Sequence, residues 1–251
     1  MITAFNHLAN FVRSAEKSVD FYTKAFGAKI VRDLLIPATN TKVIYLQIAD
    51  GLIELIAPGD LASQQYFGFE HIAFLSDDMD NDFQKLVDAG YKALVHPQVA
   101  GSGNGRICFL ADPNGLRVEL IQRNHSFFEE FDAQGVIRKI EHISIRTEDL
   151  KASVKFYTQH LPMCLVEPND INHFDETARE YVNFGATTLE IAHKVKSHVS
   201  GPLIDHIVFG VNDLSRLVDQ WEQENMVFER IGENIIQIIG PDDETIFIQQ
   251  R

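Results

Sequence analysis

Two histidines and two glutamates stand in strand-like segments among apolar neighbours: His7, Glu54, His71 and Glu119. Because residues i and i+2 share one face of a strand, the two histidines are expected to point toward an apolar interior. An ionised carboxylate in such a strand destabilises the fold unless a counter-charge meets it. Two imidazoles and two carboxylates around one divalent cation would carry no net charge. This ligand set suits Zn, Ni, Co, Mn or Fe(II), with water in the open positions.

The same residue types recur at one offset along the chain. His142 follows His7, and His206 follows His71, at an offset of 135 residues, and the triplet Phe-Tyr-Thr recurs at that offset too. Glu190 follows Glu54 at an offset of 136 residues. Several motifs that share an offset indicate a tandem duplication, which predicts two domains, at 1–124 and 137–251. No lysine or arginine recurs with these residues, so we expect no ordinary ion pair to neutralise the glutamates.

Each half divides again into two modules, and each module has the pattern of a strand, a helix and several more strands. The expected strands of the first half are 5–12, 29–35, 42–48, 52–57, 69–75, 92–96, 105–111 and 116–122, and its helices are 15–26 and 79–89. Ser14 can cap the first helix and Gly27 can end it. Asp112-Pro-Asn-Gly115 predicts a turn between the last two strands. The second half repeats this plan, so the fold class is predicted to be α+β.

Composition restricts the partners that this chain can bind. Its 251 residues are 45% hydrophobic and 23% charged, which is typical of a folded protein of one large or two ordinary domains. A net charge of −14 disfavours nucleic acids and membrane surfaces and favours a metal cation or a neutral small molecule. No run of 18 apolar residues or secretory leader pattern is present, and Cys108 and Cys164 are isolated. We therefore expect a cytoplasmic protein.

Three segments of this chain resemble the vicinal oxygen chelate superfamily, which includes glyoxalase I, methylmalonyl-CoA epimerase, extradiol dioxygenases and the bleomycin- and fosfomycin-resistance proteins. The segments are His7 with 18–22 (SVDFY), 68–73 (GFEHIA) and 109–120 (FLADPNGLRVEL), and the last is similar to the ending of glyoxalases. The resemblance covers nearly the whole chain. It implies tandem βαβββ modules that form two curled, partly open β-barrel-like domains with flanking helices, and paired modules that enclose a metal.

The resemblance also implies that each module supplies one histidine and one glutamate. If neighbouring modules pair, which we favour, the complete ligand set is His7, Glu54, His71 and Glu119. If modules are exchanged, the complete set is His71, Glu119, His142 and Glu190. The second half offers His142, Glu190 and His206, but Phe247 stands where its fourth ligand is expected, and Gln249 is a weak substitute. The second metal site is therefore expected to be degenerate.

Resemblance to glyoxalase I implies a lyase or isomerase that acts on a small molecule with vicinal oxygens. It would remove a proton next to a metal-chelated carbonyl and pass through an enediolate. Glu119 is the expected base, and Glu54 is the second carboxylate or the carrier that returns the proton. Relatives that use glutathione place an arginine four residues after the first histidine, where this chain has Phe11 and, in its second half, Arg146. Phe11, Arg146 and Phe247 are the expected substrate contacts.

Two other functions stay open. An Fe(II) extradiol ring-cleaving dioxygenase would use His7, His71 and Glu119, but Glu54 would then fill a position that dioxygen needs. A non-catalytic protein that binds a small molecule or an antibiotic is the other alternative, and the complete ligand set disfavours it. We expect no nucleic-acid or membrane partner, and either a monomer or a homodimer.

Overall fold

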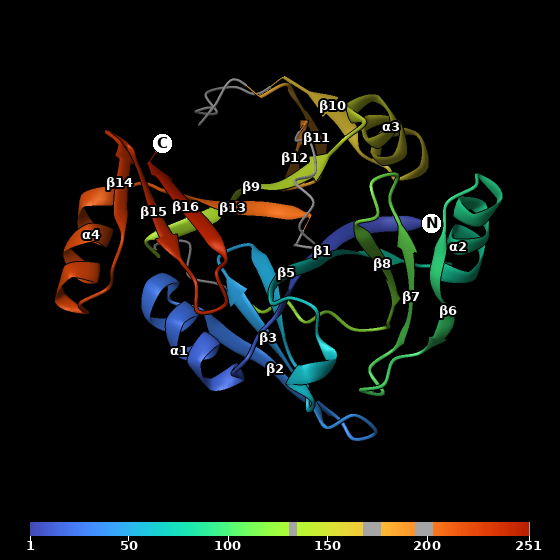
Figure 1. The fold of residues 1–251 in the computed structure, drawn as a ribbon, viewed down its shortest axis with the longest axis horizontal. Helices are drawn as coiled ribbons and strands as arrows, with labels where there is room; N and C mark the ends of the chain where they lie inside the picture. The colour runs from blue at the N-terminus through green and yellow to red at the C-terminus, as the bar shows by residue number, and fades with distance from the viewer. Residues whose placement is uncertain (131–134, 168–176, 194–202, 251) are drawn as a thin grey trace. The chain divides into compact units, whose positions relative to one another are not determined.

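The computed structural model describes residues 1–130, 135–167, 177–193 and 203–250. Within these ranges the chain forms two eight-stranded mixed sheets with flanking helices, which confirms the predicted α+β class (Figure 1). The first sheet has the strand order β2-β3-β4-β1-β5-β8-β7-β6. The second sheet has the order β10-β11-β12-β9-β13-β16-β15-β14. No helix in the described ranges is long and apolar enough to cross a membrane.

The elements of the first sheet lie where the sequence pattern predicts them. Its strands are β1 (Ile2–Phe11), β2 (Lys29–Ile36), β3 (Thr41–Ile48), β4 (Gly51–Ala57), β5 (Gly68–Ser76), β6 (Ala93–Val99), β7 (Arg106–Ala111) and β8 (Arg117–Gln122). The connecting helices are α1 (Ala15–Phe26) and α2 (Met79–Asp88), with a 3-10 turn, η1, at Leu61–Ser63. Each predicted range overlaps its observed element, and the ends differ by at most three residues.

The second sheet repeats this plan, as the duplication predicts. Its strands are β9 (Ile137–Thr147), β10 (Cys164–Val166), β11 (Arg179–Phe184), β12 (Thr187–His193), β13 (Ile204–Val211), β14 (Glu229–Gly232), β15 (Ile235–Ile239) and β16 (Thr245–Gln250). Its helices are α3 (Leu150–Lys155), which continues into a π-helical turn, η2 (Phe156–His160), and α4 (Leu214–Gln223).

Each of the four modules is a strand, a helix and three further strands. The first strand of a module pairs in parallel with the last, as β1 does with β4, β5 with β8, β9 with β12 and β13 with β16. The other strand pairs within a module are antiparallel. A parallel pair needs a crossover connection, and the intervening helix and strands supply it. The βαβββ module is therefore confirmed.

Local capping and turn chemistry explain where the elements end. The Ser14 side chain accepts a hydrogen bond from the Lys17 N–H at the start of α1, and Gly27 ends the helix in the left-handed conformation, with φ of 66°. In the turn before β8, one carboxylate oxygen of Asp112 accepts the N–H groups of Asn114 and Leu116, each at 2.8 Å. Both features follow from the predicted residues.

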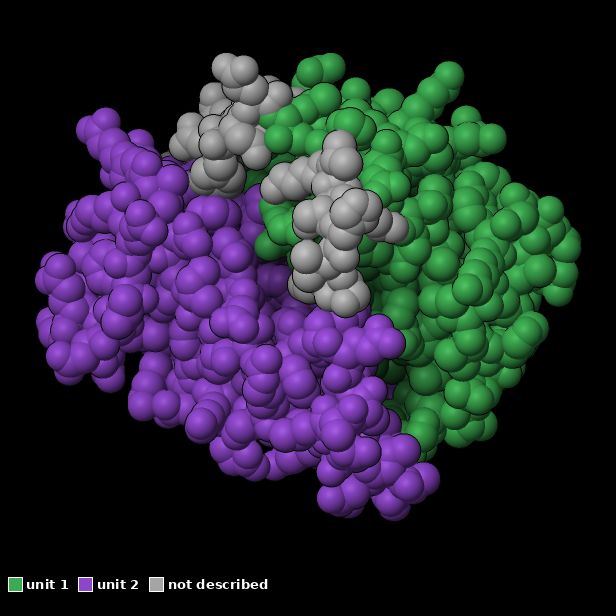
Figure 2. All heavy atoms as spheres, viewed as in Figure 1, with its two compact units in different colours: residues 1–6, 70–124, 142–205 green, residues 7–69, 125–141, 206–251 purple. Residues whose placement is uncertain are grey.

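The chain divides into two compact units, and each unit takes segments from both halves of the sequence (Figure 2). Unit 1 comprises residues 1–6, 70–124 and 142–205, and unit 2 comprises residues 7–69, 125–141 and 206–251. Unit 1 thus combines most of the second and third modules, and unit 2 combines most of the first and fourth. The domain division at 1–124 and 137–251 stays a prediction from the sequence repeat.

Buried polar contacts join the two modules inside each unit. In unit 2, Trp221 of α4 donates a hydrogen bond from its indole nitrogen to the Ala25 carbonyl at 2.9 Å, and its ring packs against Phe26. In unit 1, the Tyr157 hydroxyl donates to Asp112 at 3.1 Å. These buried aromatic side chains pack modules that lie far apart in the sequence against each other.

Candidate metal centre

In unit 2, β1 and β4 bring a histidine and a glutamate together. His7 is fully buried, and its Nε2 lies 3.0 Å from Oε2 of Glu54. The parallel register that pairs Ala9 with Glu54 sets this contact. Tyr45, which pairs with Glu54 on β3, places its ring edge-on to the imidazole at 5.3 Å. The sheet therefore holds the His7 ring on one side and directs its Nε2 toward a carboxylate.

In unit 1, β5 and β8 build the same arrangement. Nε2 of His71 lies 3.3 Å from Oε2 of Glu119, and both side chains are buried. The register pairs Ala73 with Glu119, as it pairs Ala9 with Glu54 in the first module. Phe109, opposite Glu119 on β7, stands edge-on to the His71 ring at 5.1 Å. Two modules thus repeat one geometry of an aromatic ring, a histidine and a glutamate.

The other nitrogen of His71 has its own partner. Nδ1 contacts the carboxylate of Glu70, which is buried and also forms an ion pair with Arg117, whose Nε lies at 3.0 Å. Burial lowers the pKa of His71, but the negative charges of Glu70 and Glu119 and their hydrogen bonds outweigh it and raise this pKa to about 10. Surroundings that favour a proton on the ring also favour a cation beside it.

The third module differs, because its glutamate already has a positive partner. Nε2 of His142 lies 3.9 Å from Glu190, whereas Arg179 reaches the same carboxylate at 3.2 Å. The hydroxyls of Ser144 and Tyr181 donate to Glu190 at 2.7 Å and 2.5 Å. Burial and the charge of Glu190 raise the pKa of Tyr181, so its hydroxyl stays protonated and donates. Glu190 is a neutralised, hydrogen-bonded carboxylate.

Sequence reasoning missed Arg179. The expectation that no ordinary ion pair would neutralise the glutamates is wrong for Glu190. Arg179 lies eleven residues before Glu190, and the matching residue before Glu54 is Val43. The arginine was overlooked because it does not recur between the halves, so a search for repeated cations does not find it.

In the fourth module an aromatic ring occupies the glutamate position. The parallel register pairs Val208 with Phe247, two residues after His206, just as it pairs Ala73 with Glu119. The Phe247 ring stands edge-on to His206 at 5.0 Å. The register therefore agrees with the sequence alignment that put Phe247 in place of a fourth ligand.

Two groups of described side chains could hold a metal ion: His7, Glu54, His71 and Glu119, and His142, Glu190 and His206. The ligand sets and the pairing of modules around a metal stay predictions from the sequence. The first group offers two imidazoles and two carboxylates, all buried, which fits a divalent cation. The second group offers one carboxylate, which Arg179 already neutralises, so it does not fit a dication.

Two of the expected substrate contacts, Phe11 and Arg146, lie near strand ends, whereas Phe247 is buried inside β16. Phe11 is half-buried at the end of β1, where it pairs with Ile56. Arg146 near the end of β9 is exposed, and its Nε donates to Asp205 at 2.7 Å. Arg146 is therefore held by a carboxylate of its own unit, and its role in substrate binding stays a prediction.

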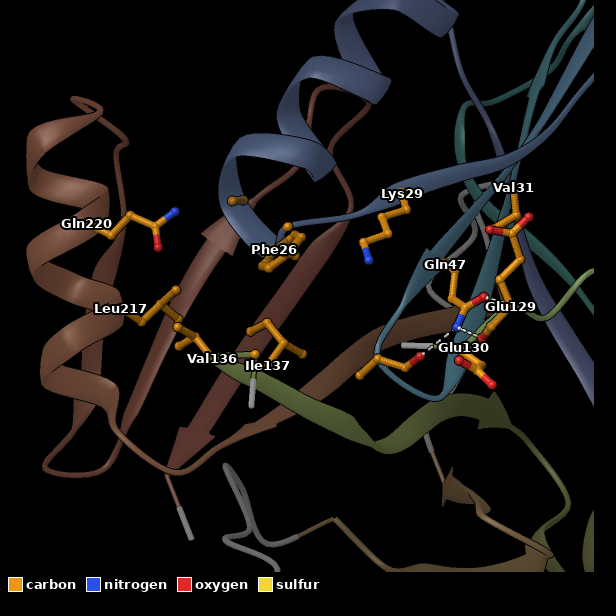
Figure 3. A pocket seen from close by; sticks show the side chains of 14 residues that line it. Phe26, Lys29, Val31, Gln47, Glu129, Glu130, Val136, Ile137, Leu217 and Gln220 are labelled. Carbon is orange, nitrogen blue, oxygen red and sulfur yellow. Dashed lines mark hydrogen bonds between the residues drawn. The ribbon is translucent and has the colours of Figure 1, made fainter. Parts of the chain in front are cut away.

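A separate pocket of about 270 Å³ lies in unit 2 (Figure 3). Phe26, Ile137 and Leu217 form apolar walls, and Lys29 and Gln47 add polar groups. None of the candidate metal ligands lines it. Phe11, Arg146 and Phe247, the expected substrate contacts, do not line it either.

Comparison with known proteins agrees with this geometry. The family model "Glyoxalase/Bleomycin resistance protein/Dioxygenase superfamily" matches residues 4–120 and 139–233. The chain belongs to this superfamily, which confirms the resemblance found in the sequence.

Individual relatives and solved structures are also similar to this chain. Lactoylglutathione lyase GLX1 of Arabidopsis thaliana is 25% identical over 248 residues, which cover 94% of this chain and 83% of that protein. The Mn(II)-bound glyoxalase of Novosphingobium aromaticivorans matches 99% of this chain and 82% of its own with a TM-score of 0.69 at 16% identity. Homoprotocatechuate 2,3-dioxygenase of Brevibacterium fuscum matches 100% and 81% with a TM-score of 0.69 at 15% identity. These structures show the shared fold.

Proposed function

We propose that this chain is a divalent-metal-dependent lyase of the glyoxalase I type, with His7, Glu54, His71 and Glu119 as the ligands of one cation. The observation that carries the proposal is the repeated pairing of a buried histidine Nε2 with a glutamate oxygen, at 3.0 Å and 3.3 Å. Four such donors in an apolar interior need a positive charge, and a dication supplies it. Relatives named lactoylglutathione lyase support the type of reaction.

Glu119 is the proposed base. When bound, the cation would act as a Lewis acid on two neighbouring substrate oxygens and stabilise the negative charge that proton removal leaves. Glu119 takes the proton from the carbon next to the carbonyl, and Glu54 is the second carboxylate or returns the proton. The edge-on rings of Tyr45 and Phe109 hold His7 and His71 in place.

The proposed substrate is a small molecule with two vicinal oxygens, and Phe11, Arg146 and Phe247 are its proposed contacts. Phe11 favours an apolar group near the first histidine. Whether the substrate carries glutathione decides the use of Arg146, because that guanidinium is bound to Asp205 and would have to exchange partners. A net charge of −14 and two free cysteines support a cytoplasmic enzyme without nucleic-acid or membrane partners, as a monomer or a homodimer.

The test uses the purified full chain. Its metal content is measured beside that of His71→Ala, and the thiol adduct of a 2-oxoaldehyde, with glutathione or a smaller thiol, is followed to its 2-hydroxyacyl thioester. We expect about one metal equivalent in the parent chain, its loss in the variant, and thioester formation that depends on the metal. A parent chain that binds no metal, or that forms no thioester from any thiol adduct, contradicts the proposal.

The extradiol dioxygenase alternative is supported by the fold alone. It would use His7, His71 and Glu119, yet Glu54 lies 3.0 Å from His7 as a fourth donor. Aerobic incubation of the Fe(II)-loaded chain with catechols separates the two functions, because only the dioxygenase would cleave the ring. A ligand that the chain binds and returns unchanged would instead indicate the non-catalytic binding protein.

A further inference from the structure

A buried carboxylate lies immediately before the candidate ligand His71. Glu70 on β5 is 3% exposed, and such a group must be matched by positive or hydrogen-bonding partners. One of its oxygens contacts Nδ1 of His71, and the other forms an ion pair with Arg117, with Nε at 3.0 Å. The mechanism above assigns no role to Glu70.

These contacts close into a ring of four residues in unit 1, which we name the His71 clamp: Glu70, His71, Phe109 and Arg117. Arg117 on β8 is the register partner of His71 on β5. Its guanidinium lies over the Phe109 ring at 4.3 Å, and Phe109 stands edge-on to His71. The clamp therefore restrains the imidazole both at Nδ1 and through the perpendicular Phe109 ring.

We propose that Glu70 is a positioning residue that fixes the tautomer and orientation of His71 for metal binding. This inference rests on the proposed function. An imidazole whose Nδ1 proton is donated to a carboxylate presents the lone pair of Nε2, and the carboxylate makes that nitrogen a stronger ligand. In this structure Nε2 of His71 is the atom that faces Glu119. Glu70 thus acts through His71, without contact to the reacting atoms.

The sequence repeat supplies a matched control. Glu141 precedes His142 on β9 as Glu70 precedes His71 on β5, and it is also buried. Its carboxylate pairs with Lys139 of the same strand at 3.1 Å. Because His142 belongs to the group that does not fit a dication, Glu141→Gln removes a comparable buried charge without touching the proposed metal centre.

The experiment measures the Zn²⁺ and Co²⁺ affinities of the purified full chain by competition with a chromophoric chelator. The variants are Glu70→Ala, Glu70→Gln and Glu141→Gln, with circular dichroism as the check of folding. We expect Glu70→Ala to weaken Zn²⁺ binding by about 10- to 100-fold. Glu70→Gln keeps an oxygen that accepts the Nδ1 proton, so it should recover part of that loss. The absorption bands of bound Co²⁺ should shift in both Glu70 variants and not in Glu141→Gln.

Glu70→Ala affinity within about twofold of the parent overturns the proposal, since loss of such a partner typically costs 10- to 100-fold. Equal weakening by the Glu70 variants and Glu141→Gln also overturns it, because the effect is then a general loss of buried charge. If Glu70→Ala does not fold, the Zn²⁺ affinity of Glu70→Gln is compared with that of Glu141→Gln. Equal affinities then overturn the proposal. A parent chain that binds neither metal contradicts the proposed function itself, which distinguishes that failure from failure of the Glu70 role alone.

Discussion

The first and third modules start from the same repeated residues and neutralise their buried glutamates in different ways. Glu54 lies 3.0 Å from His7, while Glu190 lies 3.2 Å from Arg179 and 3.9 Å from His142. In the third module the protein supplies its own cation, whereas the first leaves that place to an imidazole and the proposed metal. The comparison shows that a repeated histidine–glutamate motif does not by itself define a metal site, because one arginine can take the place of the dication.

The second and fourth modules show a different loss. Glu119 pairs with Ala73 and Phe247 with Val208, each of which lies two residues after the module's histidine, and each histidine has an aromatic ring edge-on to it. In the second module this ring is Phe109, opposite Glu119, whereas in the fourth it is Phe247 itself, and Gln237 stands opposite it. The fourth module therefore has a ring in place of the carboxylate that would bind a cation. The second group, His142, Glu190 and His206, therefore lacks a fourth ligand. Its one carboxylate is already neutralised by Arg179.

The largest expected effect is the loss of a metal ligand from the first group. His71→Ala should reduce bound metal from about one equivalent to near zero, since His71 belongs to the complete set whichever modules pair. Elemental analysis after gel filtration measures it. His206→Ala is the matched control, and a similar loss in that variant would contradict the contrast between the two groups.

Next in size is the effect on turnover of removing the proposed base. Glu119→Gln should keep the metal and lower kcat by about 10²- to 10⁴-fold, because an amide cannot accept the proton. Steady-state kinetics with the thiol adduct measures the change, and elemental analysis confirms that metal is retained. Undiminished turnover would remove Glu119 from the base role, and Glu190→Gln should leave kcat close to that of the parent.

Arg179→Met tests whether the third module depends on its own cation. The change leaves Glu190 buried without its guanidinium, which should lower the free energy of unfolding by about 3–5 kcal/mol. Urea denaturation of the variant and the parent measures the difference. Arg146→Met, which removes an exposed arginine from its pair with Asp205, should cost about 0–1 kcal/mol. Equal losses in the two variants would show that Glu190 does not depend on Arg179.

The smallest effect concerns the contacts that join modules within each unit. Tyr157→Phe removes a 3.1 Å hydrogen bond to Asp112 and should cost about 1.5–3 kcal/mol at neutral pH. Tyr22→Phe should cost less, about 0.5–1 kcal/mol, because the Tyr22 hydroxyl lies 3.5 Å from Glu244, which also accepts Asn10. Urea denaturation compares them, and a larger loss for Tyr22→Phe would contradict the ranking.

The loss in Tyr157→Phe should also depend on pH. Burial raises the pKa of Asp112, although the N–H groups of Leu116 and Asn114 and the Tyr157 hydroxyl oppose the shift. A carboxyl group whose pKa is raised by folding stabilises the fold below its unfolded pKa and loses that contribution as pH rises through the folded value. The hydroxyl favours the ionised form, so the cost of Tyr157→Phe should be full above the folded pKa and shrink as pH falls below it. A pH-independent difference in unfolding free energy would contradict this.

Local chemistry made most of the fold predictable. The helix at 15–26 was predicted because Ser14 and Gly27 mark its ends, and the turn at 112–115 because Asp112 can accept its N–H groups. The four modules follow from one repeated pattern of strand and helix periodicity. The candidate ligands could be predicted from the sequence alone, because His7 and His71 interrupt apolar faces and recur at one offset.

The contacts that depend on distant segments could not be predicted. Arg179 was missed because nothing in its local sequence shows that its guanidinium reaches Glu190. The Glu70 contact with His71 was missed because strand alternation assigns adjacent residues to opposite faces. The sequence repeat also did not predict that the second and third modules combine in one compact unit. Similar modules offer similar faces, so sequence periodicity does not decide which modules pack together.

The order of elements, the duplication and the types of the candidate ligand residues were determined by the sequence, because propensity, capping and alternation act over a few residues. Tertiary structure alone decided which carboxylate already has a cation, which imidazole nitrogen of His71 faces Glu119, and which modules pack together. Those outcomes depend on side-chain contacts between strands that are far apart in the chain. Burial makes an unpaired charge destabilise the fold, so the pairing of each charge determines which contacts form.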